Sequence, residues 1–274
     1  MMSLGLGVFD GVHLGHQKLL SHCSHALTFY PHPSQVLKKN SNLKLLTTLD
    51  ELKVLIPQLL VLNFTEEISM MSPDVFLEEI IVQQFSPQQL VVGYDYCFGR
   101  YRAGDANYLV EWGAQNGLKV LVIPPVTLGG EPVKSSRIRS AIVAGEFNHA
   151  VELLGHPYPI SGTVIHGQHR GTPLGFPTAN LDVEKMKLVP PHGVYGGYVT
   201  LDHRRYPAGI YIGSRPTFED AAAVQVEVHL IGFSGDLYGQ ALSVQITSMI
   251  RPEMKFDSVT ELKLQIEEDL RKIV

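Results

Sequence analysis

Cysteine is scarce in this chain of 274 residues, and long apolar runs are missing. The two cysteines, Cys23 and Cys97, have no metal-ligand spacing and form no disulfide framework, which is typical of a reducing compartment. No apolar run approaches the ~20 residues that span a membrane. The N-terminus also lacks the charged start and long apolar centre of a signal peptide. We therefore expect a cytoplasmic protein with no membrane partner.

A block of basic residues is missing as well. The formal net charge is −5, and the sequence offers no electrostatic reason to expect a nucleic-acid partner. Charged residues make up 18% of the chain and hydrophobic residues 45%, as in ordinary globular proteins. The length predicts one large domain or two medium ones. The sequence does not define an oligomeric state.

Up to about residue 153, short β-rich runs alternate with helical patterns. Ser72 can cap one of these helices, with Pro73 at its first position. This alternation predicts an α/β domain whose parallel sheet is covered on both faces. The expected strands are Leu4–Val8, Ala26–Phe29, Leu59–Leu62, Leu90–Gly93 and Lys119–Ile123. The expected helices follow His16, Asp50 and Ser72, the last with an apolar stripe of Val75, Phe76, Ile80 and Ile81.

After Pro157 the pattern changes to short alternating runs separated by Gly- and Pro-rich turns. Such a pattern predicts an all-β domain, an antiparallel sheet or barrel. Ser258 and Glu261 can form a capping box that starts a terminal helix. We place the domain boundary near Gly155–Pro157, giving domains 1–154 and 155–274. The expected strands are Ile160–Ile165, Gly197–Leu201, Tyr206–Ile212, Val224–Ile231 and Leu242–Ile246, and the expected inward residues of the helix are Val259, Leu262, Ile266, Leu270 and Ile273.

The segment Gly7–His16 is the most informative part of the first domain. A short apolar run ends in a Gly-rich turn, and two histidines, His13 and His16, stand where a helix opens. Glycines let the backbone approach a ligand closely, and a helix start attracts phosphate. Residues three apart share a helix face, so both imidazoles could enter one pocket. A tight turn with two surface histidines and a zinc pair are the alternatives.

Two further segments end strands of the first domain. Pro31, His32 and Pro33 form a stiff loop that suits a wall for a planar ring, although a structured turn with an exposed histidine fits equally well. Asp95 lies among aromatic residues that could be ordinary core. A carboxylate at the carboxyl end of a strand in an open α/β sheet nevertheless lies where ligands bind.

The run Lys134–Arg139 precedes a helical pattern and offers hydroxyls, backbone N–H groups and guanidiniums to a phosphate. Taken by itself, such a run is more often a solvated basic patch. In the second domain, Thr178 and Asn180 project oxygen atoms to one side, two residues apart, and hard oxygen ligands suit Mg²⁺. Glu227 lies on an alternating strand, opposite Val226 and Val228.

These motifs together resemble the bacterial bifunctional riboflavin kinase/FAD synthetases. Phe9–His16 resembles the FAD synthetase half, and the Pro177–Asn180 string with the glycines before it resembles the riboflavin kinase signature. The resemblance implies a Rossmann-like nucleotidyltransferase domain followed by a kinase barrel with a terminal helix. It implies riboflavin, FMN and ATP as substrates, Mg²⁺ as cofactor, and FMN and FAD as products. Gly213–Phe218, Gly235–Gly239 and Arg251–Phe256 complete the match.

The resemblance also assigns roles to individual residues. Glu227 would be the general base of the kinase, and His13 and His16 would serve adenylyl transfer. Thr178 and Asn180 would bind the metal. The implied ATP-binding residues are Gly7, Phe9, Asp10, Gly11, Ser135, Ser136, Arg137, Gly175, Thr178 and Asn180, and the implied flavin-binding residues are Pro31, His32, Pro33 and Asp95.

The chain departs from the family pattern at three places. Only ten residues separate His16 from Leu27, whereas a parallel crossover needs a dozen or more, so the first helix should be stunted. Lys134 replaces the first Ser of the usual Ser-Ser-Thr-Arg-Ile-Arg, and Tyr211 replaces a common Asn, which we expect to have only a structural effect. Two alternative functions remain: a kinase with an impaired adenylyltransferase site, and a non-catalytic flavin-binding module.

Overall fold

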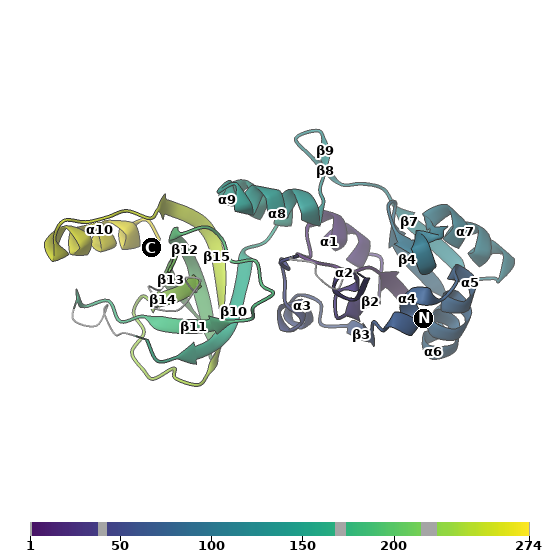
Figure 1. Cartoon of the computed structure of the whole chain (residues 1–274), viewed down its shortest axis with the longest axis horizontal. Coiled ribbons are helices and arrows are strands. Elements are labelled where there is room, and N and C mark those ends of the chain that lie inside the picture. Colours follow the sequence, from purple (N-terminus) through teal and green to yellow (C-terminus); the bar gives the residue numbers. More distant parts are fainter. Residues whose placement is uncertain (1, 38–42, 168–173, 215–223, 274) are drawn as a thin grey trace. The chain divides into compact units, whose positions relative to one another are not determined.

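The computed structural model describes residues 2–37, 43–167, 174–214 and 224–273 (Figure 1). The chain forms two compact units. The N-terminal unit contains Met1–Leu45 and Leu52–Ser135, and the C-terminal unit contains Leu46–Glu51 and Ser136–Val274. The short segment Leu46–Glu51 therefore belongs with the second half of the chain, although it lies in the first half of the sequence. The proposed boundary between residues 154 and 155 stays a prediction.

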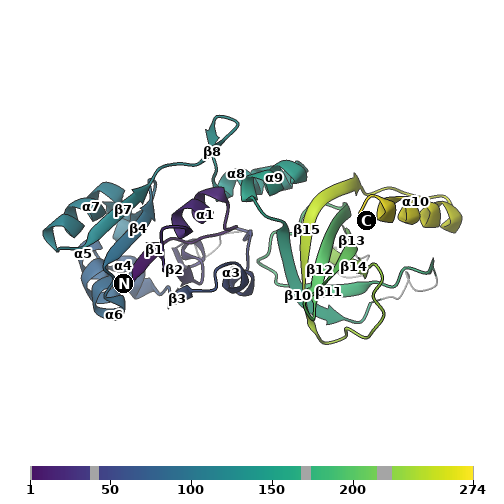
Figure 2. The same ribbon diagram turned by 180° about the vertical axis from the view of Figure 1, so that it is seen from behind.

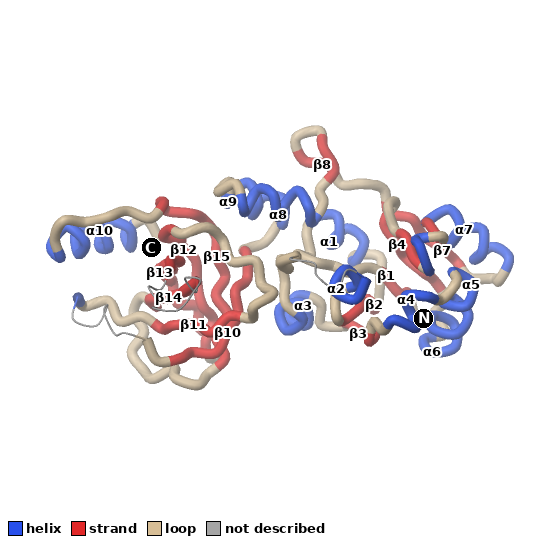
Figure 3. Tube along the Cα trace, viewed as in Figure 1, coloured by secondary structure: helices blue, strands red, loops and turns tan. Residues whose placement is uncertain are grey.

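The N-terminal unit contains a five-stranded parallel sheet. Its strand order is β3-β2-β1-β4-β7, with every neighbouring pair parallel (Figure 3). The predicted α/β fold class is confirmed, and each strand lies within two residues of its predicted bounds. The strands are β1 (Ser3–Leu6), β2 (His25–Tyr30), β3 (Leu59–Asn63), β4 (Gln89–Gly93) and β7 (Lys119–Ile123).

Helices connect these strands. The predicted short first helix is confirmed, because α1 has seven residues. Ser72 caps its helix as predicted, but Val75 is exposed and Leu77 is buried in its place, since the helix continues in π-helical form over Phe76–Val82. The elements are α1 (Leu14–Leu20), α2 (Pro33–Leu37), α3 (Leu49–Leu55), α4 (Glu66–Met70), α5 (Pro73–Val75), α6 (Gln83–Phe85), α7 (Ala106–Gln115), a 3₁₀ turn (Arg100–Arg102), and the hairpins β5 (Cys97–Phe98) with β6 (Gly104–Asp105) and β8 (Thr127–Leu128) with β9 (Glu131–Pro132).

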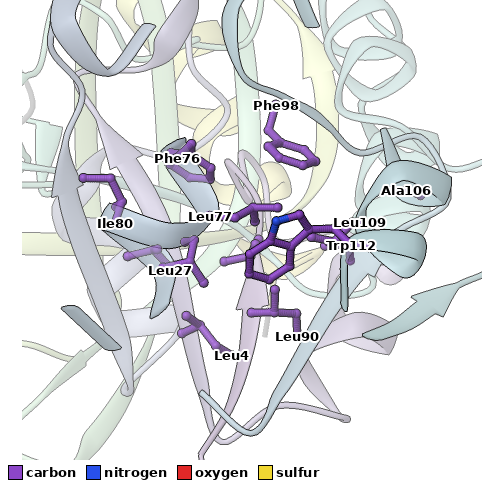
Figure 4. Packing of buried hydrophobic residues seen from close by; sticks show 13 residues of the cluster. Leu4, Leu27, Phe76, Leu77, Ile80, Leu90, Phe98, Ala106, Leu109 and Trp112 are labelled. Atoms are coloured by element: carbon purple, nitrogen blue, oxygen red, sulfur yellow. The ribbon is translucent and has the colours of Figure 1, made fainter. Parts of the chain in front are cut away.

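Apolar residues cover both faces of the sheet. On β4, Leu90 and Val92 pack in one cluster while Val91 packs in another, as strand alternation requires. The first cluster gathers around the single tryptophan, Trp112, with Phe98 beside it (Figure 4). This packing fixes the carboxyl ends of β1, β2 and β4, where the candidate site residues lie.

The C-terminal unit contains a closed barrel with strand order β10-β11-β14-β13-β12-β15 (Figure 2). All neighbouring pairs are antiparallel, so the predicted all-β class is confirmed. The sequence analysis missed β11, which contains Asn180. The strands are β10 (Tyr158–Ile165), β11 (Ala179–Val183), β12 (Gly193–Leu201), β13 (Arg204–Ser214), β14 (Val224–Leu230) and β15 (Ala241–Pro252).

Within the part of the C-terminal half that the structure describes, the helices are α8 (Ser135–Val143), α9 (Phe147–Leu154) and α10 (Val259–Arg271). The capping box of α10 is confirmed, because Ser258 Oγ accepts a hydrogen bond from Glu261 N at 3.2 Å. The expectation that Val259 faces inward is wrong: it is exposed, since it lies in the first, outlying turn of the helix. Among the described residues, no helix is both long and apolar enough to cross a membrane.

Candidate active sites

The loop between β1 and α1 is tightly built around Phe9. Its φ of 55° and that of Gly11, 87°, turn the backbone sharply, and the Phe9 ring is fully buried. A Cβ at Gly7 would lie 3.1 Å from that ring, so the backbone there depends on glycine. Asp10 is also buried. The loop is therefore a rigid, narrow turn at the carboxyl end of β1, a place where open α/β sheets bind ligands.

His13 and His16 lie together at the start of α1. His13 precedes the helix instead of lying within it, which corrects the expected shared helix face, and its Nδ1 accepts a hydrogen bond from His16 N at 3.3 Å. The two rings are nevertheless stacked, with centroids 3.6 Å apart. Gly15 makes room for this pair, because a Cβ there would lie 3.1 Å from the His13 ring.

Burial determines the charge of His16. Desolvation, with the neighbouring His13 as a smaller cause, holds the pKa of His16 well below its ordinary value. His16 is therefore neutral at physiological pH. Its buried Nδ1 has no hydrogen-bond partner among the described residues. A neutral imidazole with a free ring nitrogen can donate to or accept from a phosphate or water ligand.

Ser135 ties the start of α8 to this loop. Its Oγ donates to Asp10 O at 2.8 Å. The run from Lys134 was expected to precede a helix, but α8 already begins at Ser135, which places Ser136 and Arg137 in the first turn. Nη2 of Arg137 lies 3.3 Å from His149 Nε2. The phosphate-binding roles of these residues remain predictions.

The two candidate flavin segments follow β2 and β4. Pro31 and His32 form the connection after β2, and Pro33 starts α2. Asp95, after β4, forms an ion pair with Lys134 at 3.1 Å. Hydrogen bonds to Tyr94 and Asp95 raise the pKa of Lys134. This pairing was missed by the sequence analysis, because 39 positions separate the two residues in the chain.

The kinase candidates meet on the outer face of the barrel. Along β14, Val226 and Val228 are buried in the barrel core, while Glu227 lies on the opposite face. Thr178 Oγ1 donates to Glu227 Oε2 at 2.8 Å. Asn180 on β11 stands directly opposite Glu227 in the strand register. The structure thus brings together Thr178 from the loop before β11, Asn180 from β11 and Glu227 from β14.

Gln225 also belongs to this group, although the sequence analysis did not select it. Its Nε2 donates to both Glu227 Oε1 and Asn180 Oδ1. Only the alternation of β14 could have indicated it, since Gln225 shares the face of Glu227. The cluster offers hydroxyl, amide and carboxylate oxygens linked by hydrogen bonds through Thr178 and Gln225, and this donor set suits Mg²⁺.

The backbone around the kinase cluster is closely packed. A Cβ at Gly167 would lie 2.0 Å from Asn180 Nδ2, so no side chain fits there. Gly175 has a φ of 90°, which favours glycine. His229 contacts Pro177 O at 2.8 Å. Residues 171–173 and 215–218, which belong to the matched motifs, lie outside the described residues.

Tyr211, the departure from the family pattern, faces Glu227 from β13. Its hydroxyl donates to Glu253 Oε1 at 2.6 Å. Burial, followed by this hydrogen bond, raises the pKa of Tyr211 to about 12. Tyr211 is therefore a neutral neighbour of the cluster, and its hydroxyl is held by Glu253, the residue that follows β15.

Comparisons with known proteins find a matching family for each half of the chain. The FAD synthetase family matches residues 1–137, and the riboflavin kinase family matches residues 154–274. The bifunctional riboflavin kinase/FMN adenylyltransferase of Listeria monocytogenes is 34% identical over 97% of this chain and 89% of its own length. The Bacillus subtilis protein of the same name is 34% identical over 99% of this chain and 91% of its own length.

A solved structure described as a macrolide-efflux protein from Streptococcus pneumoniae is also similar. Its TM-score is 0.84 at 30% identity, and the match covers 99% of this chain and 93% of that one. The whole chain, not one unit alone, therefore has a counterpart of known structure.

Proposed function

This chain belongs to the family of bifunctional riboflavin kinase/FMN adenylyltransferases, and we propose that it makes FMN and then FAD through the residues described above. The observation that carries this proposal is the cluster of Glu227, Thr178 and Asn180. A hydroxyl donates there to a carboxylate, and an amide-bearing residue lies opposite that carboxylate in the strand register, a donor set that suits phosphoryl transfer from Mg·ATP. A protein that only stored flavin would need neither a base nor a metal ligand.

In the kinase reaction, the ribityl 5′-hydroxyl of riboflavin attacks the γ-phosphate of ATP, and ADP leaves. Glu227 takes the hydroxyl proton as the new O–P bond forms. Thr178 and Asn180 would hold the phosphates together with a Mg²⁺ ion, and the bound ion would supply neutralisation of phosphate charge. Gly175 gives the loop the close backbone approach that a triphosphate requires.

In the adenylyl transfer, a phosphate oxygen of FMN attacks the α-phosphate of a second ATP, and pyrophosphate leaves. That oxygen is already anionic at neutral pH, so no strong base is needed. Catalysis consists of positioning and charge stabilisation. We assign the ATP to the loop Gly7–Gly11, the His13–His16 pair and Ser135–Arg137. The flavin is assigned to the Pro31–Pro33 segment and Asp95.

We assign adenylyl transfer to residues 1–154 and the kinase to residues 155–274. The matched ranges of the two families, 1–137 and 154–274, support this division. The two unpaired cysteines, Cys23 and Cys97, suit a reducing compartment, and we propose that the enzyme works in the cytoplasm.

Separation of the flavins after incubation with riboflavin, ATP and Mg²⁺ tests the proposal. We expect FMN to appear first and FAD to follow. FMN without FAD would identify a kinase with an impaired adenylyltransferase site. Unchanged riboflavin bound to the protein would identify a flavin-binding module instead.

A further inference from the structure

Gln225 connects two groups of the kinase site. It lies two positions before Glu227 on β14, so both side chains project from one face of the strand. Its Nε2 donates to Glu227 Oε1 at 2.9 Å and also to Asn180 Oδ1. Thr178 donates to the other carboxylate oxygen of Glu227. Both oxygens of the candidate base are therefore held by neighbouring side chains.

Asn180 is the buried, closely packed residue of this cluster. It is only 8% exposed, it pairs with Glu227 in the register of β11 and β14, and it packs against the backbone of Gly167. Glu227 is less buried and projects from the outer face of the barrel. The amide of Gln225 links the well-packed residue to the exposed one.

We propose that Gln225 is a positioning residue for riboflavin phosphorylation, which holds Glu227 and Asn180 in one catalytic arrangement; this inference rests on the proposed kinase function. A carboxylate has about four acceptor sites, so two fixed donors still leave a lone pair for the substrate hydroxyl. A neutral amide orients the base without competing for its proton. Loss of this orientation should lower kcat strongly, because a 1 Å displacement of a catalytic group can reduce the rate about 10²-fold.

Tyr211 lies opposite Glu227 on β13, but its hydroxyl donates to Glu253 and not to Glu227. Among the described residues, Gln225 and Thr178 are the side chains that donate to this carboxylate.

Two variants of the full chain test this role. Gln225→Met keeps the length but removes the donor, and Gln225→Glu keeps the shape but adds a like charge. We expect Gln225→Met to lower kcat for riboflavin tenfold or more, with riboflavin KM changed by less than threefold. Gln225→Glu should lower kcat further, because an ionised carboxylate cannot donate to Glu227 and repels it.

The matched control is Gln245→Met, which removes a barrel glutamine whose amide donates to Ser243 instead. Its kcat and riboflavin KM should equal those of the parent. FAD formation from FMN should be unchanged in every variant, because adenylyl transfer is assigned to residues 1–154. Melting curves of all variants show whether the C-terminal unit is folded.

Parent-like kcat in both Gln225 variants would overturn the proposal. So would a loss of kcat that comes with an equally large change in riboflavin KM and a lower melting temperature, because a purely structural role predicts that result. A parent protein that does not phosphorylate riboflavin contradicts the proposed function itself. The two failures are therefore distinguishable.

Discussion

A buried ion pair should control the stability of the C-terminal unit. Lys187 Nζ donates to Glu51 Oε2 and to Leu46 O, each at 2.6 Å, and lies 4.2 Å from the centre of the Tyr158 ring. The other oxygen of Glu51 accepts from Ser161 N at 2.9 Å. Neither charged side chain is exposed. The pair therefore anchors the segment Leu46–Glu51 to the barrel of its own unit.

Lys187→Met leaves the Glu51 carboxylate buried without its cation. Breaking a buried pair in this way costs about 3–5 kcal/mol of unfolding free energy. For a unit of this size, that is a decrease of roughly 6–20 °C in Tm. The double variant Lys187→Met/Glu51→Gln removes both charges, so its destabilisation should be smaller than the sum of the two single changes.

Two signals can separate the units in a thermal experiment. Trp112, the single tryptophan, lies in the N-terminal unit, and its fluorescence follows that unit. Residual riboflavin kinase activity after heating follows the C-terminal unit. The control is Lys272→Met, which removes an exposed pair with Glu268 and should leave both signals unchanged.

A Lys187→Met protein as heat-resistant as the parent would refute this reasoning. Strict additivity of the two single variants would also refute it, because additivity means that the residues do not interact.

Removing either imidazole, in His13→Ala or His16→Ala, should lower FAD formation from FMN tenfold or more, since a hydrogen bond to a charged group is worth roughly 1.5–3 kcal/mol. FMN formation from riboflavin should not change; a parallel loss of both products on a flavin chromatogram would point to misfolding. Because the pKa of His16 is held well below its ordinary value, the unfolded chain binds a proton that the folded chain does not, and the free energy of unfolding should fall as pH drops below about 6.5. Urea curves of His16→Gln should show a free energy of unfolding that falls less steeply with decreasing pH than in the parent. An equally steep fall contradicts the assignment. A fragment of residues 156–274 contains Lys187 without Glu51, so it should unfold at lower urea than the same fragment with Lys187→Met, and the reverse order would argue against the buried pair.

Much of the fold could be predicted from local patterns. Lys119–Ile123 has the bounds of β7, because a short apolar run between polar residues is typical of a buried parallel strand. Strand β11 was missed, although Ala179, Leu181 and Val183 alternate with Asn180 and Asp182 as they do on a half-buried strand. Its existence depends on pairing with β10 and β14, which are distant in sequence.

The candidate sites were predictable only where a motif marked them. Thr178 and Glu227 were selected from separate motifs, and the structure brings them within hydrogen-bond distance. Gln225 was not selected, because a polar residue on a strand is indistinguishable from a solvated one until the register is known. The Glu51–Lys187 pair was hidden for the same reason: no local pattern links charges 136 positions apart.

The central claim is that one chain performs two reactions with separate residues, and Glu227→Gln tests it most directly. The variant and the parent are each incubated with ATP and Mg²⁺, once with riboflavin and once with FMN, and the flavins are separated. We expect the variant to lose FMN formation by about 10²–10⁴-fold while it converts FMN to FAD at the parent rate. Riboflavin phosphorylation within a few-fold of the parent, or an equal loss of both reactions, would contradict the account.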